Sequence, residues 1–220
     1  MPVASLPSEY GVGDFGKGAY AFADCIHQMG FGVWQILPLN PLGYGNSPYQ
    51  PYSSYAGDPL YISLEKLAED GMLPGAPEAF RKESAQIDYE AVRAYKEPYL
   101  RKAFASFFPD ENYEEFASQE WVYEYGVFYM LKQKNDKKCW LDWEEEDKRW
   151  MMERSAEFTP EQEEEIQYQM FLQYVFYCQW MELKAYVNRL DIRIMGDLPF
   201  YVGIDSLDVW ANTRCFLLDE

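Results

Sequence analysis

The sequence is poor in the residues on which several common functions depend. Its 220 residues hold a single histidine, His27, and 19 basic side chains against 37 acidic ones, for a net charge of −18. A surface this acidic repels phosphate backbones and anionic membranes, which argues against a nucleic-acid-binding or membrane-docking protein. His27 falls in the first predicted helix, and we expect it to be a surface or core residue rather than a catalyst.

The cysteines and the apolar segments exclude further classes. The four cysteines form no CxxC pair, and their spacings suit no zinc site: Cys25, Cys139, Cys178 and Cys215. No apolar run approaches the ~18 residues needed to span a bilayer. The first residues, Met1–Leu6, lack the basic and apolar regions of a signal peptide. We therefore expect four reduced thiols in a cytoplasmic protein.

Aromatic residues, in contrast, are abundant. They make up 18% of the chain, with 19 tyrosines and 7 tryptophans. Flat rings with a polar edge can stack on the apolar faces of sugar rings. Composition alone leaves two alternatives open, an aromatic-rich core and a carbohydrate-binding surface.

The first third of the chain reads as alternating helix and strand. Apolar residues at spacings of three and four predict a helix over residues 17–30, which Gly30 would end. The short apolar run 33–39 predicts a buried strand, and the Gly/Pro/Asn/Ser-rich stretch 40–55 predicts an irregular loop. Residues 59–73 read as a strand end and a short helix.

The rest of the chain predicts a helical middle and a second α/β segment. Residues 74–158 are charged and helical in pattern, and we interpret their acidic run, 144–147, as a solvated face. Thr159-Pro160 opens a long helix that can reach Arg189, and a second buried strand follows over residues 192–199.

Alternating helices and apolar strands indicate an α/β fold with a parallel sheet. We predict an incomplete (β/α)8 TIM-type barrel, containing the first strands and a helical inserted subdomain. The predicted domains are the start of the barrel (1–73), the helical subdomain (74–158) and the barrel continuation (159–220).

Two segments follow the predicted strands, where parallel α/β folds carry their functional residues. The loop Gly43–Gln50 gathers two tyrosines, two amides and a hydroxyl, which could stack a sugar and bond its hydroxyls. The alternative is a tight turn that needs its glycines and proline for backbone reasons. Asp197 ends the second strand, where a charge is costly unless it is paired or functional. It reads as a residue for substrate-hydroxyl binding, metal ligation or acid/base work, with a salt-bridged or helix-capping aspartate as the alternative.

Ordered motifs at both ends of the chain resemble the amylomaltase family, also called disproportionating enzymes. The resemblance rests on Ser5–Ser8, Gly11–Gly16, Trp34–Leu39, Gly43–Gln50, Ala56–Pro59, Phe171–Tyr174, Gln179–Lys184, Arg193–Pro199, Asp205–Asn212 and Leu218–Glu220. This sequence departs from the family's pattern at four positions. Asn46 stands where the family often has Asp, and Asp58 stands where Asn is common. Gly203 replaces a usual Ala, and Thr213 replaces a usual Pro.

The resemblance implies a 4-α-glucanotransferase that moves α-1,4-glucan segments between maltooligosaccharides with retention of configuration. Retention uses a nucleophilic and an acid/base carboxylate roughly 5 Å apart. The family's Arg-Ile-Asp-His-type nucleophile motif does not occur here, so no catalytic residue is assigned. We expect the chain to be an N-terminal part that stops before the catalytic carboxylates.

What the resemblance does imply for this chain is substrate binding. Asp197 resembles the family's aspartate that contacts the sugar next to the cleavage point. Ser47 and Tyr49 resemble glucan-contacting positions, and Tyr44 a secondary contact. The implied partners are maltooligosaccharides, amylose or other α-1,4-glucans and the missing C-terminal half, with no cofactor. The alternatives are an α-glucoside hydrolase and a non-catalytic α-glucan-binding module.

Overall fold

The computed structural model describes residues 1–81, 86–154 and 157–218, apart from the side chain of Tyr44. The chain forms two compact units, each built from separate stretches of sequence. The strand unit comprises Met1–Leu39, Gly57–Phe108 and Val175–Leu198. The loop unit comprises Asn40–Ala56, Pro109–Tyr174 and Pro199–Glu220. Neither unit coincides with one of the predicted domains, and the division into 1–73, 74–158 and 159–220 stays a prediction.

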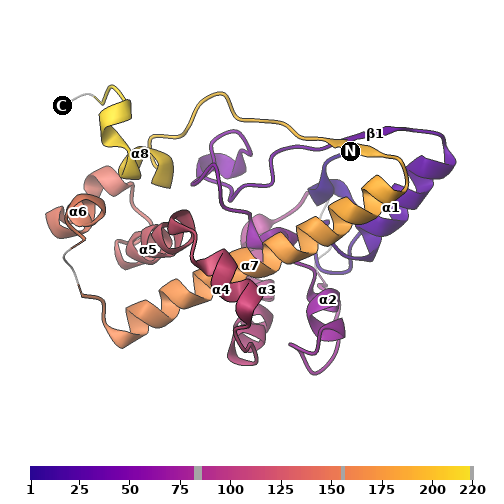
Figure 1. Ribbon diagram of the computed structural model, residues 1–220, viewed down its shortest axis with the longest axis horizontal. Coiled ribbons are helices and arrows are strands. Elements are labelled where there is room, and N and C mark those ends of the chain that lie inside the picture. Colours follow the sequence, from indigo (N-terminus) through magenta and orange to yellow (C-terminus); the bar gives the residue numbers. More distant parts are fainter. Residues whose placement is uncertain (82–85, 155–156, 219–220) are drawn as a thin grey trace. The chain divides into compact units, whose positions relative to one another are not determined.

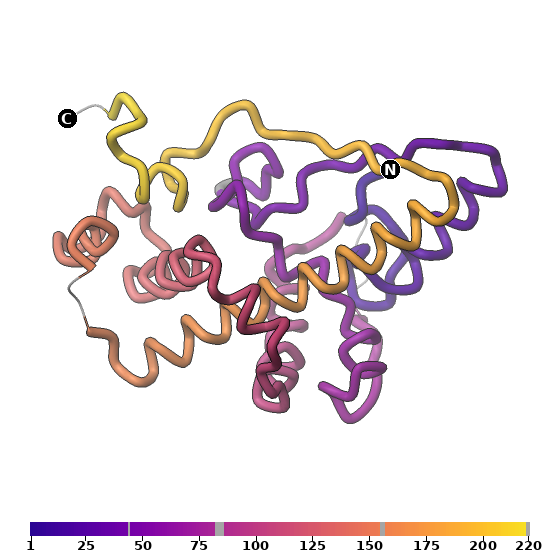
Figure 2. Tube along the Cα trace, viewed as in Figure 1, coloured from indigo at the N-terminus to yellow at the C-terminus, as the bar shows by residue number. Residues whose placement is uncertain are grey.

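The strand unit contains the sheet of the described residues, a parallel pair of strands. β1 (Val33–Gln35) pairs with β2 (Arg193–Met195), with Trp34 opposite Ile194. The amide of Ile36 extends the pairing by donating to the carbonyl of Met195 at 3.0 Å. Figures 1 and 2 show the late, orange part of the chain returning beside the early, purple part. The predicted parallel arrangement is therefore confirmed.

The strands are shorter and less buried than the sequence predicts. Only Trp34 of β1 is buried, whereas the side chains of Val33 and Met195 are 42% and 47% exposed. Successive strand residues point to opposite faces of a sheet. The sheet face that carries Trp34 packs against helices α1 and α7 and forms a core with them. The opposite face of the sheet is not covered by the described residues of the strand unit. The prediction of two buried strands is thus wrong for this structure, in which only Trp34 of the two strands is buried.

The remaining elements of the strand unit are mostly helical. They are η1 (Val3–Ser5), α1 (Lys17–Gln28), η3 (Pro59–Tyr61), α2 (Leu64–Glu69) and α3 (Tyr89–Ala105). The predicted first helix is confirmed as α1, which ends where Gly30 takes a φ of +79°. His27 lies on this helix and bonds through Nδ1 to the carbonyl of Leu190 at 2.9 Å. The strand end predicted near residue 59 is the 3-10 turn η3 instead, because Asp58 caps it by accepting from the amide of Leu60.

The predicted long helix is confirmed as α7 (Pro160–Arg189), which is labelled in Figure 1. Its start is a reciprocal cap. The hydroxyl of Thr159 accepts from the amide of Gln162 at 3.3 Å, and the Gln162 side chain accepts from the amide of Thr159 at 2.9 Å. Residues 160–174 belong to the loop unit, and residues 175–189 belong to the strand unit.

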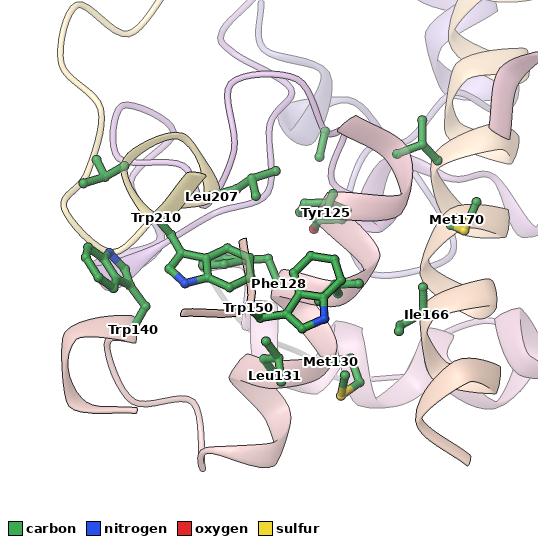
Figure 3. Close-up of a cluster of buried hydrophobic side chains, with 14 of the residues drawn as sticks. Tyr125, Phe128, Met130, Leu131, Trp140, Trp150, Ile166, Met170, Leu207 and Trp210 are labelled. Carbon is green, nitrogen blue, oxygen red and sulfur yellow. The ribbon is translucent and has the colours of Figure 1, made fainter. Parts of the chain in front are cut away.

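The helical character predicted for the middle of the chain is confirmed in both units. The loop unit contains η2 (Tyr44–Asn46), α4 (Glu111–Ala117), α5 (Glu120–Lys134), η4 (Trp140–Asp142), α6 (Glu145–Glu153), α8 (Leu207–Ala211) and η5 (Thr213–Cys215). Its core is rich in aromatic rings. Figure 3 shows Phe128 of α5 with Trp150 of α6 and Trp210 of α8, and Trp150 and Trp210 stack with ring centroids 6.1 Å apart.

The acidic run 144–147 is only partly the solvated face that the sequence predicts. Glu144, Glu145 and Glu146 are exposed, but the side chain of Asp147 is 5% exposed. Asp147 accepts from the Lys134 ammonium at 2.7 Å and from the Asn135 amide at 2.8 Å. Residues three and four apart share one face of a helix, so Asp147 lies on the same buried face of α6 as Trp150 and requires partners.

A buried charge pair joins α3 to the N-terminal loop of the strand unit. The ammonium of Lys96 donates to the carbonyls of Leu60 and Ile62 at 2.7 and 2.8 Å, and it lies 3.4 Å from a carboxylate oxygen of Asp14. The other Asp14 oxygen accepts from the amide of Gly16 at 2.9 Å, where α1 begins. Burial lowers the pKa of Lys96 and raises the pKa of Asp14, while the charge of each partner opposes the shift.

Asp58, one of the departures noted above, is also buried and paired. Arg93 of α3 binds it with two hydrogen bonds, at 3.0 and 2.7 Å. The guanidinium compensates the negative charge of Asp58, which an asparagine at this position would not carry.

Among the residues that the structure describes, no helix combines the length and the apolar character that a membrane span needs.

The Lys96–Asp14 pair yields a stability prediction. Asp14→Ala leaves a buried ammonium without its carboxylate, so we expect the free energy of unfolding to fall by about 3–5 kcal/mol. In the double variant Asp14→Ala/Lys96→Met the loss should be smaller than in Asp14→Ala alone. Urea unfolding of the three chains measures this. Lys17→Met is the control, because Lys17 forms an exposed pair with Glu65 and should change stability little. Equal losses for Asp14→Ala and Lys17→Met would contradict the prediction.

Candidate functional site

The predicted glucan loop is held closed at its base. Asn40 donates from its side-chain amide to the carbonyls of Ser54 and Ala56, both at 3.0 Å. Leu42 and Pro51 form an antiparallel bridge, and the amide of Tyr52 donates to the carbonyl of Pro41 at 3.1 Å. The loop, residues 40–56, is therefore a closed structure that projects residues 43–50 from a hydrogen-bonded stem.

The tip of the loop is a pair of tight turns. Gly45 and Asn46 have φ values of +71° and +54°, a region that glycine and asparagine adopt more readily than other residues. The amide of Asn46 donates to the carbonyl of Gly43 at 3.2 Å. Gly43 is required for a different reason, because a Cβ there would lie 2.1 Å from the carbonyl oxygen of Gln50. The turn interpretation of these residues is thus correct, and it is compatible with a binding role for their neighbours.

Two of the predicted contacts, Ser47 and Tyr49, stand together on this tip. The hydroxyl of Ser47 accepts from the amide of Tyr49 at 3.3 Å, and the Ser47 carbonyl accepts from the amide of Gln50 at 3.3 Å. Tyr49 is 45% exposed and Ser47 is half-buried. The arrangement fixes the backbone of both residues and leaves a flat ring and a hydroxyl at the surface. The side chain of Tyr44 lies outside the described part of the chain.

Asp197, the remaining predicted contact, belongs to the strand unit. It lies two residues beyond the end of β2 and is half-buried. In the parallel pair, the carboxyl ends of β1 and β2 lie at the same edge. Residues 36–39 follow β1 within the strand unit, and the loop 40–56 comes after them along the chain.

The structure adds anchoring contacts that the sequence did not reveal. The carbonyl of Tyr52 accepts from the amide of Leu207 at 2.8 Å, and the amide of Ser54 donates to the carboxylate of Asp208 at 2.9 Å. These residues are about 155 positions apart in the chain. The motif 205–212 was part of the family resemblance, but its sequence carries no signal that it supports the loop.

The described residues contain nothing that suggests a metal centre near these positions. No group of three or more histidine, cysteine, aspartate or glutamate side chains among them could hold a metal ion. All four cysteines are free thiols. A cavity of about 550 Å³ lies in the strand unit beside Ser8, Tyr10 and Asp14, but none of the predicted contacts lines it. Burial there raises the pKa of Tyr10 to about 12.

Comparison with solved structures defines the class of fold. An amylomaltase from Streptococcus agalactiae, solved in complex with acarbose, matches with a TM-score of 0.91 and 34% identity. The match covers all of this chain and 46% of that one. The chain therefore has the fold of the corresponding part of an amylomaltase.

Sequence comparison identifies the family. The model of the 4-alpha-glucanotransferase family matches residues 1–220, and the chain belongs to this family. The 4-alpha-glucanotransferase of Synechocystis sp. is 40% identical over 98% of this chain, and that of Clostridium butyricum is 38% identical over 100%. These matches span 45% and 47% of the two relatives, so the chain spans about half the length of the curated relatives it matches. The predicted family is thereby confirmed.

The loop geometry yields a second prediction. Gly43→Ala places a methyl group against the carbonyl of Gln50, so we expect a loss of roughly 1–3 kcal/mol in the free energy of unfolding. Gly45→Ala is the matched control, because its added Cβ meets nothing within 4 Å and only the positive φ opposes it. Urea unfolding compares the two, and limited proteolysis shows whether the loop 40–56 opens. A Gly43→Ala chain as stable and as protease-resistant as Gly45→Ala would show that the close approach does not constrain the loop.

Proposed function

We propose that this chain is the N-terminal part of a 4-α-glucanotransferase that transfers α-1,4-glucan segments between maltooligosaccharides. The observation that carries the proposal is the match to the acarbose-bound amylomaltase over the whole chain. The exposed ring and adjacent hydroxyl on the tip of loop 40–56 support it, because they suit a sugar face and its hydroxyls. The parallel pair β1–β2 would contribute two strands to a (β/α)8 barrel that the rest of the protein completes.

The proposed reaction is a retaining double displacement. A carboxylate attacks the anomeric carbon of the donor as an acid protonates the leaving glycosidic oxygen, which gives a covalent glycosyl-enzyme. A hydroxyl of the acceptor glucan then attacks the anomeric carbon and gives its proton to the same acid/base residue, and the enzyme carboxylate leaves. Both carboxylates would come from the part of the protein that follows this chain.

The residues of this chain would bind the donor and acceptor glucans. The Tyr49 ring would stack on a glucose ring, and Ser47 would exchange hydrogen bonds with sugar hydroxyls. The Asp197 carboxylate would accept from hydroxyls of the sugar next to the cleavage point, and Tyr44 would make a secondary contact. The reaction needs no metal or organic cofactor, since carboxylates alone carry it. We place the protein in the cytoplasm, which the four free thiols support.

The first test is turnover of maltotriose. The longest native product of the gene should release glucose together with matching longer maltooligosaccharides, and the 220-residue chain alone should release neither. Chromatography of the products measures both, and the activity should persist in a chelator. Glucose without longer products would favour an α-glucoside hydrolase. Turnover by the isolated 220-residue chain would refute the assignment of catalysis to the missing half. No turnover by a longest product that ends at Glu220 would favour a glucan-binding module.

The second test concerns the binding residues. In the longest native product, Tyr49→Ala removes a stacking ring, and we expect KM for maltotriose to rise about three- to tenfold. Asp197→Asn removes a charged acceptor and should lower kcat/KM by about tenfold to a hundredfold. Tyr177→Ala is the control, because Tyr177 on α7 is 47% exposed, close to the value for Tyr49. Equal effects of Tyr49→Ala and Tyr177→Ala would remove Tyr49 from the proposed site.

A further inference from the structure

Beneath the stem of the loop lies a buried lysine that the proposed chemistry does not use. Lys132, near the end of α5, has a side chain that is only 3% exposed. Its ammonium lies 4.7 Å from the ring centroid of Tyr52 and 5.9 Å from that of Phe128. Tyr52 is the stem residue whose amide and carbonyl bond to Pro41 and Leu207. A cation over an aromatic face is attracted by the ring, and more strongly where water is excluded.

The same ammonium is bound to the segment that anchors the loop. Lys132 donates to the carboxylate of Asp205 at 2.6 Å and to the carbonyl of Lys138 at 3.0 Å. The second oxygen of Asp205 accepts from the amide of Trp140 at 3.3 Å, and the indole of Trp140 donates to the carbonyl of Ile204 at 2.6 Å. Lys132 and Asp205 therefore join α5, the η4 turn and the segment 204–208 at one point.

This cluster constrains the loop from two sides. The backbone of Tyr52 and Ser54 is held by Leu207 and Asp208, which lie two and three residues after Asp205 in the chain. The ring of Tyr52 is held by the cation that Asp205 also binds. A loop stem fixed through both its backbone and its side chain can present residues 43–50 in a single orientation, which lowers the entropy lost when a ligand binds.

Burying a charged side chain costs desolvation free energy, so a buried ion pair adds little to stability by itself. An apolar side chain of similar size often stabilises a protein equally well, whereas a buried ion pair has directional requirements that a methionine lacks. Two of the contacts of Lys132 are with the Tyr52 ring of the loop stem and with Asp205 of the segment that anchors the loop, and a third is with the carbonyl of Lys138 before η4.

We propose that Lys132 and Asp205 are positioning residues for glucan binding, which act through Tyr52 on the loop that carries Ser47 and Tyr49. The proposal rests on the proposed function and deepens it, since it assigns to the buried Lys132 and the half-buried Asp205 an effect on substrate affinity. Their loss should raise KM and leave the chemical step largely unchanged.

The experiment compares Lys132→Met with Lys134→Met in the longest native product of the gene. Both lysines lie on α5, and each is paired to an aspartate, at 2.6 Å for Lys132 and 2.7 Å for Lys134. The partner of Lys134 is Asp147, which lies outside the loop and its anchors. We expect Lys132→Met to raise KM for maltotriose about five- to tenfold with kcat within about twofold of the wild type. Lys134→Met should leave KM unchanged, and Lys132→Arg should recover part of the affinity.

Hydrogen exchange provides a readout that does not depend on activity. Backbone amides of residues 42–54 should exchange faster in Lys132→Met and in Tyr52→Leu than in the wild type, and should be unchanged in Lys134→Met. If Lys132→Met does not fold, Asp205→Asn takes its place, because it keeps the side-chain size and removes the charge.

The outcomes separate the two proposals. A wild-type protein without glucan transfer would end the proposed function, while faster exchange confined to the Lys132 and Tyr52 variants would still support positioning of the loop. A wild-type protein with transfer, in which Lys132→Met shows an unchanged KM and unchanged exchange of residues 42–54, would overturn the inference. An equal rise in KM for Lys132→Met and Lys134→Met would also overturn it, because a general loss of stability would then explain both.

Discussion

The parallel pairing of β1 with β2 is the constraint on which the arrangement of the chain depends. It joins residues 33–35 to residues 193–195, so nearly the whole sequence between them forms one crossover connection. Because the strands run in the same direction, their carboxyl ends meet at one edge. Within the strand unit, residues 36–39 leave β1 from that edge, and Asp197 follows β2 there. An antiparallel pair would have sent these two segments to opposite ends.

Buried charges hold the long crossover in place. In the strand unit, Lys96 and Arg93 of α3 bind Asp14 and Asp58, which flank the turns before α1 and at η3. In the loop unit, Lys132 binds Asp205 beneath the stem of the loop. The two residues of each pair are 35 to 82 positions apart in the chain. Aromatic packing could also join such segments, but an ion pair restricts their relative orientation more closely. The chain has 19 basic side chains against 37 acidic ones, and several of the basic ones pair with buried carboxylates, as Arg93 does with Asp58 and Lys96 with Asp14.

Much of the fold could be predicted from the sequence because its signals are local. The helices α1 and α7 follow from apolar spacing and from their end residues, Gly30 and Thr159. The loop follows from its glycines, and its turn at Gly45–Asn46 from residues that tolerate a positive φ. The extent to which each residue is buried, in contrast, could not be predicted from local sequence signals. The strand residues Val33 and Met195 are exposed here, and Asp147 is buried within a run of acids that reads as solvated. Burial depends on which distant segments cover a residue, and periodicity does not report that.

The sequence by itself determined the family and the absence of the family's nucleophile motif from these residues, because both depend on the order of residue types along the chain; the glucan contacts stay a prediction. It also determined that the strands pair in parallel, since apolar runs that alternate with helices have few other ways to form a sheet. Only the tertiary structure decided that Ser47 and Tyr49 stand on a closed, anchored tip, and that Tyr52, Lys132 and Asp205 meet beneath it. The contacts of Lys132 with Asp205 and with the Tyr52 ring join residues 73 and 80 positions apart, and no local pattern encodes which lysine will lie under which ring.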